Sequence, residues 1–97
     1  MIGAWNYPFL LSLKPVISSI AAGNTVILKP SELPSRTSKV MAQLIQKYFD
    51  PSLLTVVEGG IDKTSYLLAL RFDKIFFTGS TQVGKIVYEA AAKNLTP

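Results

Sequence analysis

The sequence contains no cysteine and no histidine among its 97 residues. The chain therefore has no thiol nucleophile, no imidazole base, no disulfide and no cysteine or histidine ligand for zinc. Charged residues are also scarce, at 16% of the sequence, against about 25% in an average soluble domain. These absences exclude many common catalytic and metal-binding sites, and we expect no metal site.

Apolar residues are abundant for so short a chain, at 48%. A chain of this length forms one domain at most, with a thin core. We therefore expect other protein to cover part of its surface, and we expect the isolated chain to be marginally stable or to self-associate. The net charge is +4, but the basic residues occur singly, which argues against a nucleic-acid partner.

The apolar N-terminal segment, residues 2–20, resembles neither a signal peptide nor a membrane span. Asn6, Pro8, Lys14 and Pro15 interrupt it, and no basic segment precedes it. Both targeting signals and spans need a longer uninterrupted apolar run. We expect a cytoplasmic protein with no membrane contact from this segment.

Apolar spacing predicts four helices alternating with three short strands. The helices are expected at residues 9–22, from Ser35 or Thr37 to about residue 48, from a cap at Asp62 to Leu70, and from a cap at Ser80 or Thr81 to Asn94 and Pro97. Pro15 predicts a kink in the first helix or a late start near Ser12. The strands are expected at residues 25–29, 54–57 and 74–77, each a continuous apolar run.

Strands joined through helices run parallel, with right-handed crossovers. The predicted fold class is therefore α/β, a three-layer open parallel sheet (Rossmann-like) with helices on both faces. It is incomplete, because a strand is expected before Trp5 and almost no residues precede it. Ligands of such sheets bind beyond the carboxyl ends of the strands. Four turns meet this condition: Trp5–Asn6, residues 29–32, residues 58–60 and residues 78–84.

The last of these turns has the sequence of a phosphate-binding loop. In residues 73–85 an apolar run stops at Gly79 and a helix follows, so backbone N–H groups point at an anion. Gly79 and Lys85 fit the nucleoside triphosphate P-loop, but Ile86 stands where serine or threonine must hold magnesium. The three-glycine dinucleotide fingerprint is absent as well. Alternatively, Gly79 and Gly84 only permit a tight turn and close packing of helix on strand.

Three segments together resemble the aldehyde dehydrogenase superfamily, most closely its class 3 (fatty and aromatic aldehyde) branch. They are residues 5–9 (WNYPF), 21–32 (AAGNTVILKPSE) and 77–85 (FTGSTQVGK). The resemblance implies an NAD(P)-dependent enzyme that oxidises an aldehyde to a carboxylate. In that family a cysteine attacks the carbonyl, a hydride passes to the cofactor, and a glutamate activates water.

The resemblance also implies roles for individual residues. Asn6 would be catalytic, its amide donating to the developing oxyanion; alternatively it caps the following helix. The cofactor, NAD with NADP also considered, would contact the matching positions: Trp5 at the nicotinamide end, Lys29 and Glu32 at the adenosine ribose, Gly59 and Val83 at the adenine, and Gly79, Ser80, Thr81 and Gly84 at the pyrophosphate.

The family's nucleophilic cysteine and general-base glutamate have no counterpart in this chain. We therefore expect residues 1–97 to be a partial dinucleotide-binding domain, without the catalytic and oligomerisation regions, and inactive alone. The complete enzyme is expected to be a homo-oligomer. An alternative is a stand-alone nucleotide-binding or interaction module, a truncated remnant without catalysis.

Overall fold

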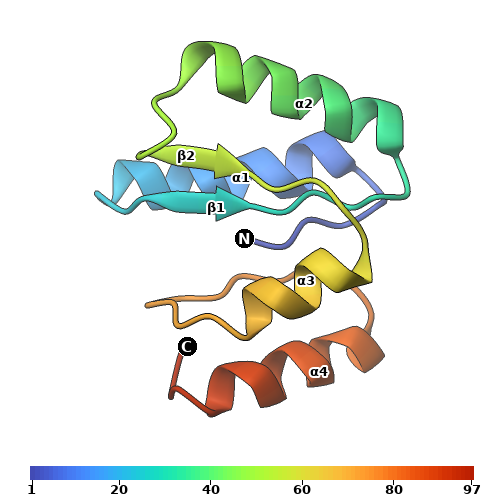
Figure 1. Ribbon diagram of the computed structural model, residues 1–97, viewed down its shortest axis with the longest axis vertical. Helices are drawn as coiled ribbons and strands as arrows, with labels where there is room; N and C mark the ends of the chain where they lie inside the picture. Colours follow the sequence, from blue (N-terminus) through green and yellow to red (C-terminus); the bar gives the residue numbers. More distant parts are fainter.

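The computed structural model describes all residues from 1 to 97, and its fold is mixed α/β. In chain order the elements are α1 (Pro8–Ala21), β1 (Val26–Leu28), α2 (Ser35–Tyr48), β2 (Leu54–Val56), α3 (Ile61–Leu68) and α4 (Thr81–Ala92) (Figure 1). The four predicted helices and the first two predicted strands are present, so the sequence pattern located these elements correctly.

The strands β1 and β2 form a two-stranded parallel sheet. Val26 lies opposite Leu54, and Leu28 lies opposite Val56. The N-terminal segment extends this arrangement, since Ile2 makes isolated parallel bridges to Lys29 on one side and to Phe77 on the other. Four chain segments therefore run in the same direction, in the order β2, β1, residues 1–3 and residues 76–77.

The prediction of a third strand at residues 74–77 is wrong. Only Phe77 makes a ladder contact, and its partner is Ile2. A strand forms only where a neighbouring strand offers a row of backbone partners. The N-terminal segment offers one bridge, where Ile2 donates its N–H to the carbonyl of Phe76 at 2.9 Å. On the other side, Ile75 donates its N–H to the carbonyl of Pro97 at 3.0 Å.

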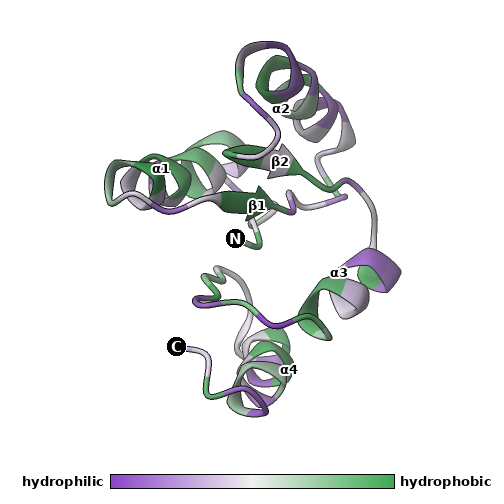
Figure 2. Ribbon diagram, turned by 60° about the vertical axis from the view of Figure 1, so that its left-hand side comes forward, coloured by the Kyte–Doolittle hydropathy of each residue, from purple (hydrophilic) through white to green (hydrophobic).

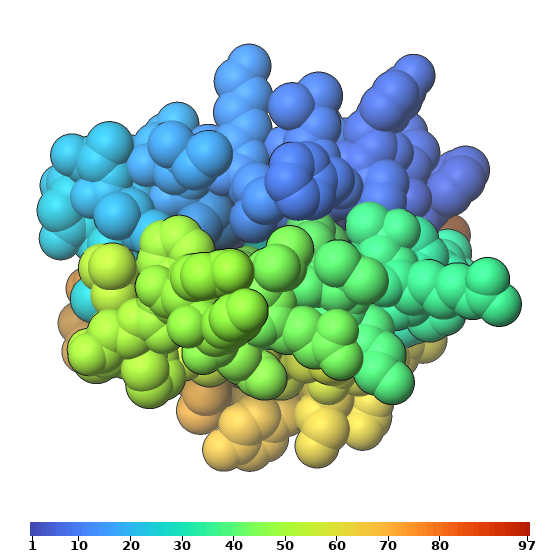
Figure 3. Space-filling model, turned by 90° about the horizontal axis from the view of Figure 1, so that it is seen from above, coloured from blue at the N-terminus to red at the C-terminus, as the bar shows by residue number.

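The helices form two pairs. Helix α1 packs on β1, α2 packs on β2 and on α1, and α3 packs on α4. Figures 1 and 2 show α1, α2 and the sheet on one side of the N-terminal segment, with α3 and α4 on the other. From above, α1 and α2 lie side by side and cover most of the molecule (Figure 3). Residues 1–3 therefore lie between the two helix pairs.

The core lies between the sheet and the first helix pair. Its buried side chains come from α1, β1, α2 and β2 (Val16, Val26, Leu28, Ile45 and Leu54). Figure 2 shows β1 in green as strongly hydrophobic, while β2 is partly pale because Thr55 interrupts its apolar residues. Only 15 of 97 residues are buried, so the hydrophobic core is thin, and large apolar side chains remain exposed on every helix.

Several predicted helix ends differ from the structure by one to four residues. Helix α1 runs through Pro15 instead of starting near Ser12. Pro34, not Ser35 or Thr37, occupies the cap of α2, and no side chain caps it. The cap of α3 is Gly60, which places Asp62 in the first turn, where its charge favours the positive helix end.

The end of helix α4 also differs from the prediction. The helix ends at Ala92, and the residue that takes a left-handed conformation after it is Leu95, with φ 53°, where the sequence favoured Asn94 and Pro97. None of the four helices has the length and apolar character to cross a bilayer.

Candidate functional site

Four turns follow the carboxyl ends of the four parallel segments. They are Trp5–Asn6, residues 29–32, residues 58–60 and residues 78–84, each directly after a segment of the ladder. Parallel segments end at the same edge, so the turns share that edge, which is where open α/β sheets bind their ligands. The predicted site residues all lie on these turns or on the first turn of α4.

Lys29 and Glu32 form the one salt bridge of the structure. The Nζ of Lys29 donates to Oε2 of Glu32 at 2.7 Å. The Lys29 side chain is 4% exposed and that of Glu32 is 45% exposed. The hydrogen bond from Lys29 holds the pKa of Glu32 below its ordinary value. Glu32 is therefore fixed as a carboxylate, with a part that faces solvent and can accept further hydrogen bonds.

A hollow of about 180 Å³ lies between the carboxyl ends of β1 and β2. Its walls come from the turns after both strands and from the start of α2 (Pro30, Ser31, Glu32, Ser35, Ser38, Glu58 and Gly59). Glu32 and Gly59 were predicted for the cofactor site, and the structure brings them together. Ser35 and Ser38 were not predicted as site residues, and Glu58 lies in the predicted turn at residues 58–60 but was not singled out.

Gly59 has a backbone that only glycine adopts readily. Its φ is 142°, in the region where a side chain is strained. An added Cβ would also overlap the aliphatic part of Lys63, whose own Cβ would be 3.1 Å away. Gly59 is therefore required by its backbone conformation and by the close approach of Lys63, whose aliphatic part covers one side of it.

Ser80 caps α4, as predicted. It lies in an extended conformation before the helix, and its Oγ accepts a hydrogen bond from the N–H of Val83 at 3.3 Å. The remaining N–H groups of the first turn have no partner within the helix. The turn from Gly79 to Thr81 is exposed. It presents a helix N-terminus and a hydroxyl to solvent, which suits an anion.

The two glycines of this turn have different packing. A Cβ added to Gly79 would overlap the ring of Phe77, with Cε2 only 3.0 Å away, whereas a Cβ added to Gly84 would meet the same ring at 3.5 Å, an ordinary contact. Close packing against Phe77 therefore explains why position 79 is a glycine. It does not explain the glycine at position 84, where alanine would fit.

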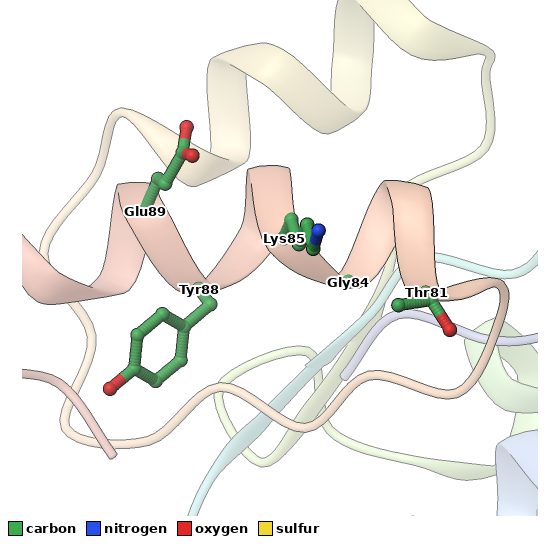
Figure 4. A pocket seen from close by; sticks show the side chains of 5 residues that line it. All are labelled: Thr81, Gly84, Lys85, Tyr88 and Glu89. Carbon is green, nitrogen blue, oxygen red and sulfur yellow. The ribbon is translucent and has the colours of Figure 1, made fainter.

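A second hollow, of about 360 Å³, lies along α4. Thr81, Gly84, Lys85, Tyr88 and Glu89 line it (Figure 4). Gly84 leaves a gap between Thr81 and Tyr88, whose side chains flank it in the figure. Tyr88 is 77% exposed, and none of the five residues is buried, so this is a shallow surface depression. Two predicted site residues, Thr81 and Gly84, lie here.

The other predicted site residues line neither hollow: Trp5, Asn6, Lys29, Gly79, Ser80 and Val83. Trp5 is 64% exposed, and Asn6 is exposed as well. The N-cap of α1 is Tyr7, a left-handed residue with no side-chain cap bond, so the alternative role of Asn6 as a helix cap is wrong. Its amide makes no hydrogen bond within the chain, which leaves it available to a ligand. No group of three or more acidic side chains is placed to hold a metal ion.

The four turns thus share one edge of a mixed α/β fold, and comparison with known proteins gives the family. The model described as the aldehyde dehydrogenase family matches residues 1–97. The chain belongs to this family, as the three sequence segments indicated.

Its relatives confirm the resemblance to the class 3 branch. The chain is 59% identical to aldehyde dehydrogenase family 3 member A2 of Pongo abelii and 55% identical to family 3 member H1 of Arabidopsis thaliana, in each case over all of this chain and 20% of the relative. It is 56% identical to a Rattus norvegicus protein named aldehyde dehydrogenase, dimeric NADP-preferring, over all of this chain and 21% of that protein.

A solved structure, described as the substrate-bound state of Staphylococcus aureus AldH, matches with a TM-score of 0.97 and 53% identity. The match covers 99% of this chain and 21% of the other. The chain thus spans about a fifth of the length of the relatives it matches.

Proposed function

We propose that residues 1–97 are part of the dinucleotide-binding domain of an NAD(P)-dependent aldehyde dehydrogenase that oxidises an aldehyde to a carboxylate. In the complete domain the two helix pairs would cover both faces of a three-layer parallel sheet. The supporting observation is the Lys29–Glu32 ion pair beside a hollow at the carboxyl ends of two parallel strands. The complete enzyme would be a cytoplasmic homo-oligomer.

The residues at the carboxyl ends of the parallel segments have the chemistry to bind the successive parts of a nicotinamide dinucleotide. Glu32 is ionised and partly exposed, so it can accept from the ribose hydroxyls while Lys29 holds it in place. Gly59, which has no side chain, would let the adenine lie against its backbone on the side that Lys63 leaves free, and Val83, 42% exposed, would cover the other side of the adenine. These contacts bind and orient the adenosine half.

The start of α4 suits the pyrophosphate. The free N–H groups of its first turn, with Ser80 and Thr81, would donate to phosphate oxygens, and the helix dipole adds a favourable field. Gly79 and Gly84 keep the approach open. Trp5 would lie near the nicotinamide, which supplies the hydride-accepting chemistry when the cofactor is bound.

Asn6 would be the one catalytic residue of the chain. Its amide is exposed and unpaired, and in this role it would donate to the oxygen that becomes negative when the aldehyde carbonyl is attacked. The loss of one such donor typically costs about 2.7 to 4 kcal/mol of activation free energy. The chain holds no cysteine, so the attacking thiolate would come from elsewhere in a protein of the relatives' length.

The test uses the gene product that carries these 97 residues. We expect it to bind NAD, measured by calorimetry, and to form NADH from NAD and an aliphatic or aromatic aldehyde. An Asn6→Ala variant should lose about 100- to 1,000-fold in kcat while its Kd for NAD stays unchanged. A Lys29→Met variant should bind NAD more weakly, since Glu32 loses its partner.

The same experiment separates the alternative, a nucleotide-binding or interaction module without catalysis. NAD binding without NADH formation from any aldehyde would support the nucleotide-binding module. Absence of both binding and turnover in a folded protein would favour the interaction module and refute the enzyme.

A further inference from the structure

A second glutamate lines the hollow at the ends of β1 and β2. Glu58 lines this hollow together with Glu32, although the two residues follow different strands. No lysine or arginine is among the lining residues. The ionisable residues that line the hollow are therefore the two glutamates.

The charges of the two glutamates are balanced differently. Glu32 is paired with the buried ammonium of Lys29 at 2.7 Å, so this pair is close to neutral as a unit. Glu58 is exposed and makes no salt bridge, since the Lys29–Glu32 pair is the one in the structure. Its negative charge is therefore the uncompensated charge of the hollow.

One basic side chain, that of Lys63, lies close by, so its position affects whether the charge of Glu58 is compensated. The aliphatic part of Lys63 covers Gly59, but Lys63 does not line the hollow and forms no ion pair with Glu58. Glu58 thus lines the hollow, whereas Lys63 is an exposed residue of α3 that does not line it.

We propose that Glu58 is a specificity-determining residue, which makes this hollow reject a 2′-phosphate and so favours NAD over NADP. The inference rests on the proposed function, in which Glu32 holds the adenosine ribose in the same hollow. A 2′-phosphate carries a charge of about −1.5 to −2 near neutral pH. It would replace a neutral hydroxyl in front of the uncompensated carboxylate of Glu58, whereas NAD places no charge there.

The magnitude follows from the exposure of the hollow. Charges a few ångströms apart in a water-like dielectric interact weakly, and salt screens them over about 10 Å at 0.1 M. We therefore expect Glu58 to change the ratio of the two dissociation constants by about 3- to 10-fold, and we expect this effect to shrink as salt is added.

The test measures Kd for NAD and for NADP by calorimetry on the gene product and on two variants. Glu58→Gln removes the charge and keeps the size of the side chain. Asp73→Asn removes one charge at the opposite edge of the sheet, where the carboxylate lines neither hollow. We expect Glu58→Gln to tighten NADP binding about 3- to 10-fold relative to NAD, and Asp73→Asn to leave the ratio unchanged.

The failures of the two proposals are distinguishable. If the unsubstituted protein binds NAD but Glu58→Gln leaves the NADP to NAD ratio unchanged, or moves it as far as Asp73→Asn does, the role of Glu58 is wrong and the proposed function stands. If the unsubstituted protein prefers NADP, the role of Glu58 is wrong as well. If the folded protein binds neither dinucleotide, both proposals are refuted.

Discussion

The glycines at positions 79 and 84 should respond oppositely to substitution by alanine. Both contact the ring of Phe77, but a Cβ at Gly79 would overlap it, with Cε2 3.0 Å away, whereas a Cβ at Gly84 would meet it at 3.5 Å. The first substitution has to push the ring aside. The second fits the existing space.

The two free energies can be worked out separately. Overpacking a well-packed contact typically costs about 1 to 3 kcal/mol, and Gly79→Ala should cost about 1 kcal/mol, at the low end of that range, because the ring of Phe77 is only partly buried and can move. Gly84 lies inside α4, where alanine is more favourable than glycine by about 0.5 to 1 kcal/mol. The unfolding free energies of the two variants should thus differ by at least about 1.5 kcal/mol.

Urea unfolding of the gene product, followed by circular dichroism, measures the difference. Phe77→Leu is the matched second substitution, because a smaller side chain leaves room for the new methyl group at position 79. In the Phe77→Leu background, Gly79→Ala should lose most of its cost. The reasoning is refuted if Gly84→Ala destabilises the protein as much as Gly79→Ala, or if Phe77→Leu does not reduce the effect at position 79.

Further predictions concern the core, the helix cap, the ion pair and the surface. Leu28→Ala, at a fully buried position, should cost about 2 to 5 kcal/mol in urea unfolding. Ser80→Ala should cost about 0.5 to 2 kcal/mol, while Ser80→Asp should retain the cap; equal losses would contradict this. Glu32 has a lowered pKa, so its contribution is present above its ordinary value of 4.5 and is lost as pH falls through the lower folded value. The destabilisation caused by Glu32→Gln should therefore be larger at neutral pH than in acid, and a pH-independent difference would argue against the pair. The isolated 97-residue polypeptide, with only 15 residues buried, should sediment as an oligomer rather than as a monomer.

Much of the candidate site was predictable because its residues follow strands directly. The sequence located Lys29 and Glu32 after one buried run and Gly59 after the next, and the structure brings Glu32 and Gly59 to one hollow. The cap at Ser80 was also predictable, since capping depends on neighbouring residues alone. The roles of these residues in cofactor binding remain predictions.

Other features depend on contacts that a local pattern does not contain. The run at residues 74–77 has the composition of a strand, yet it forms a single bridge because its neighbour, the segment containing Ile2, offers only one. The placement of Ser35 and Ser38 at the hollow depends on how α2 begins against the end of β1. The different packing of Gly79 and Gly84 depends on the ring of Phe77.

The sequence by itself determined the order of the helices, the first two strands, the family and the turn before α4. These follow from periodicity, capping residues and motifs, all of which are local in the chain. Only the tertiary structure decided that the charge of Glu32 is balanced by a buried lysine and that Glu58 shares its hollow. The reason is physical: burial and charge balance depend on the distance between side chains in space, and parallel strands bring together residues that lie about 25 positions apart in sequence.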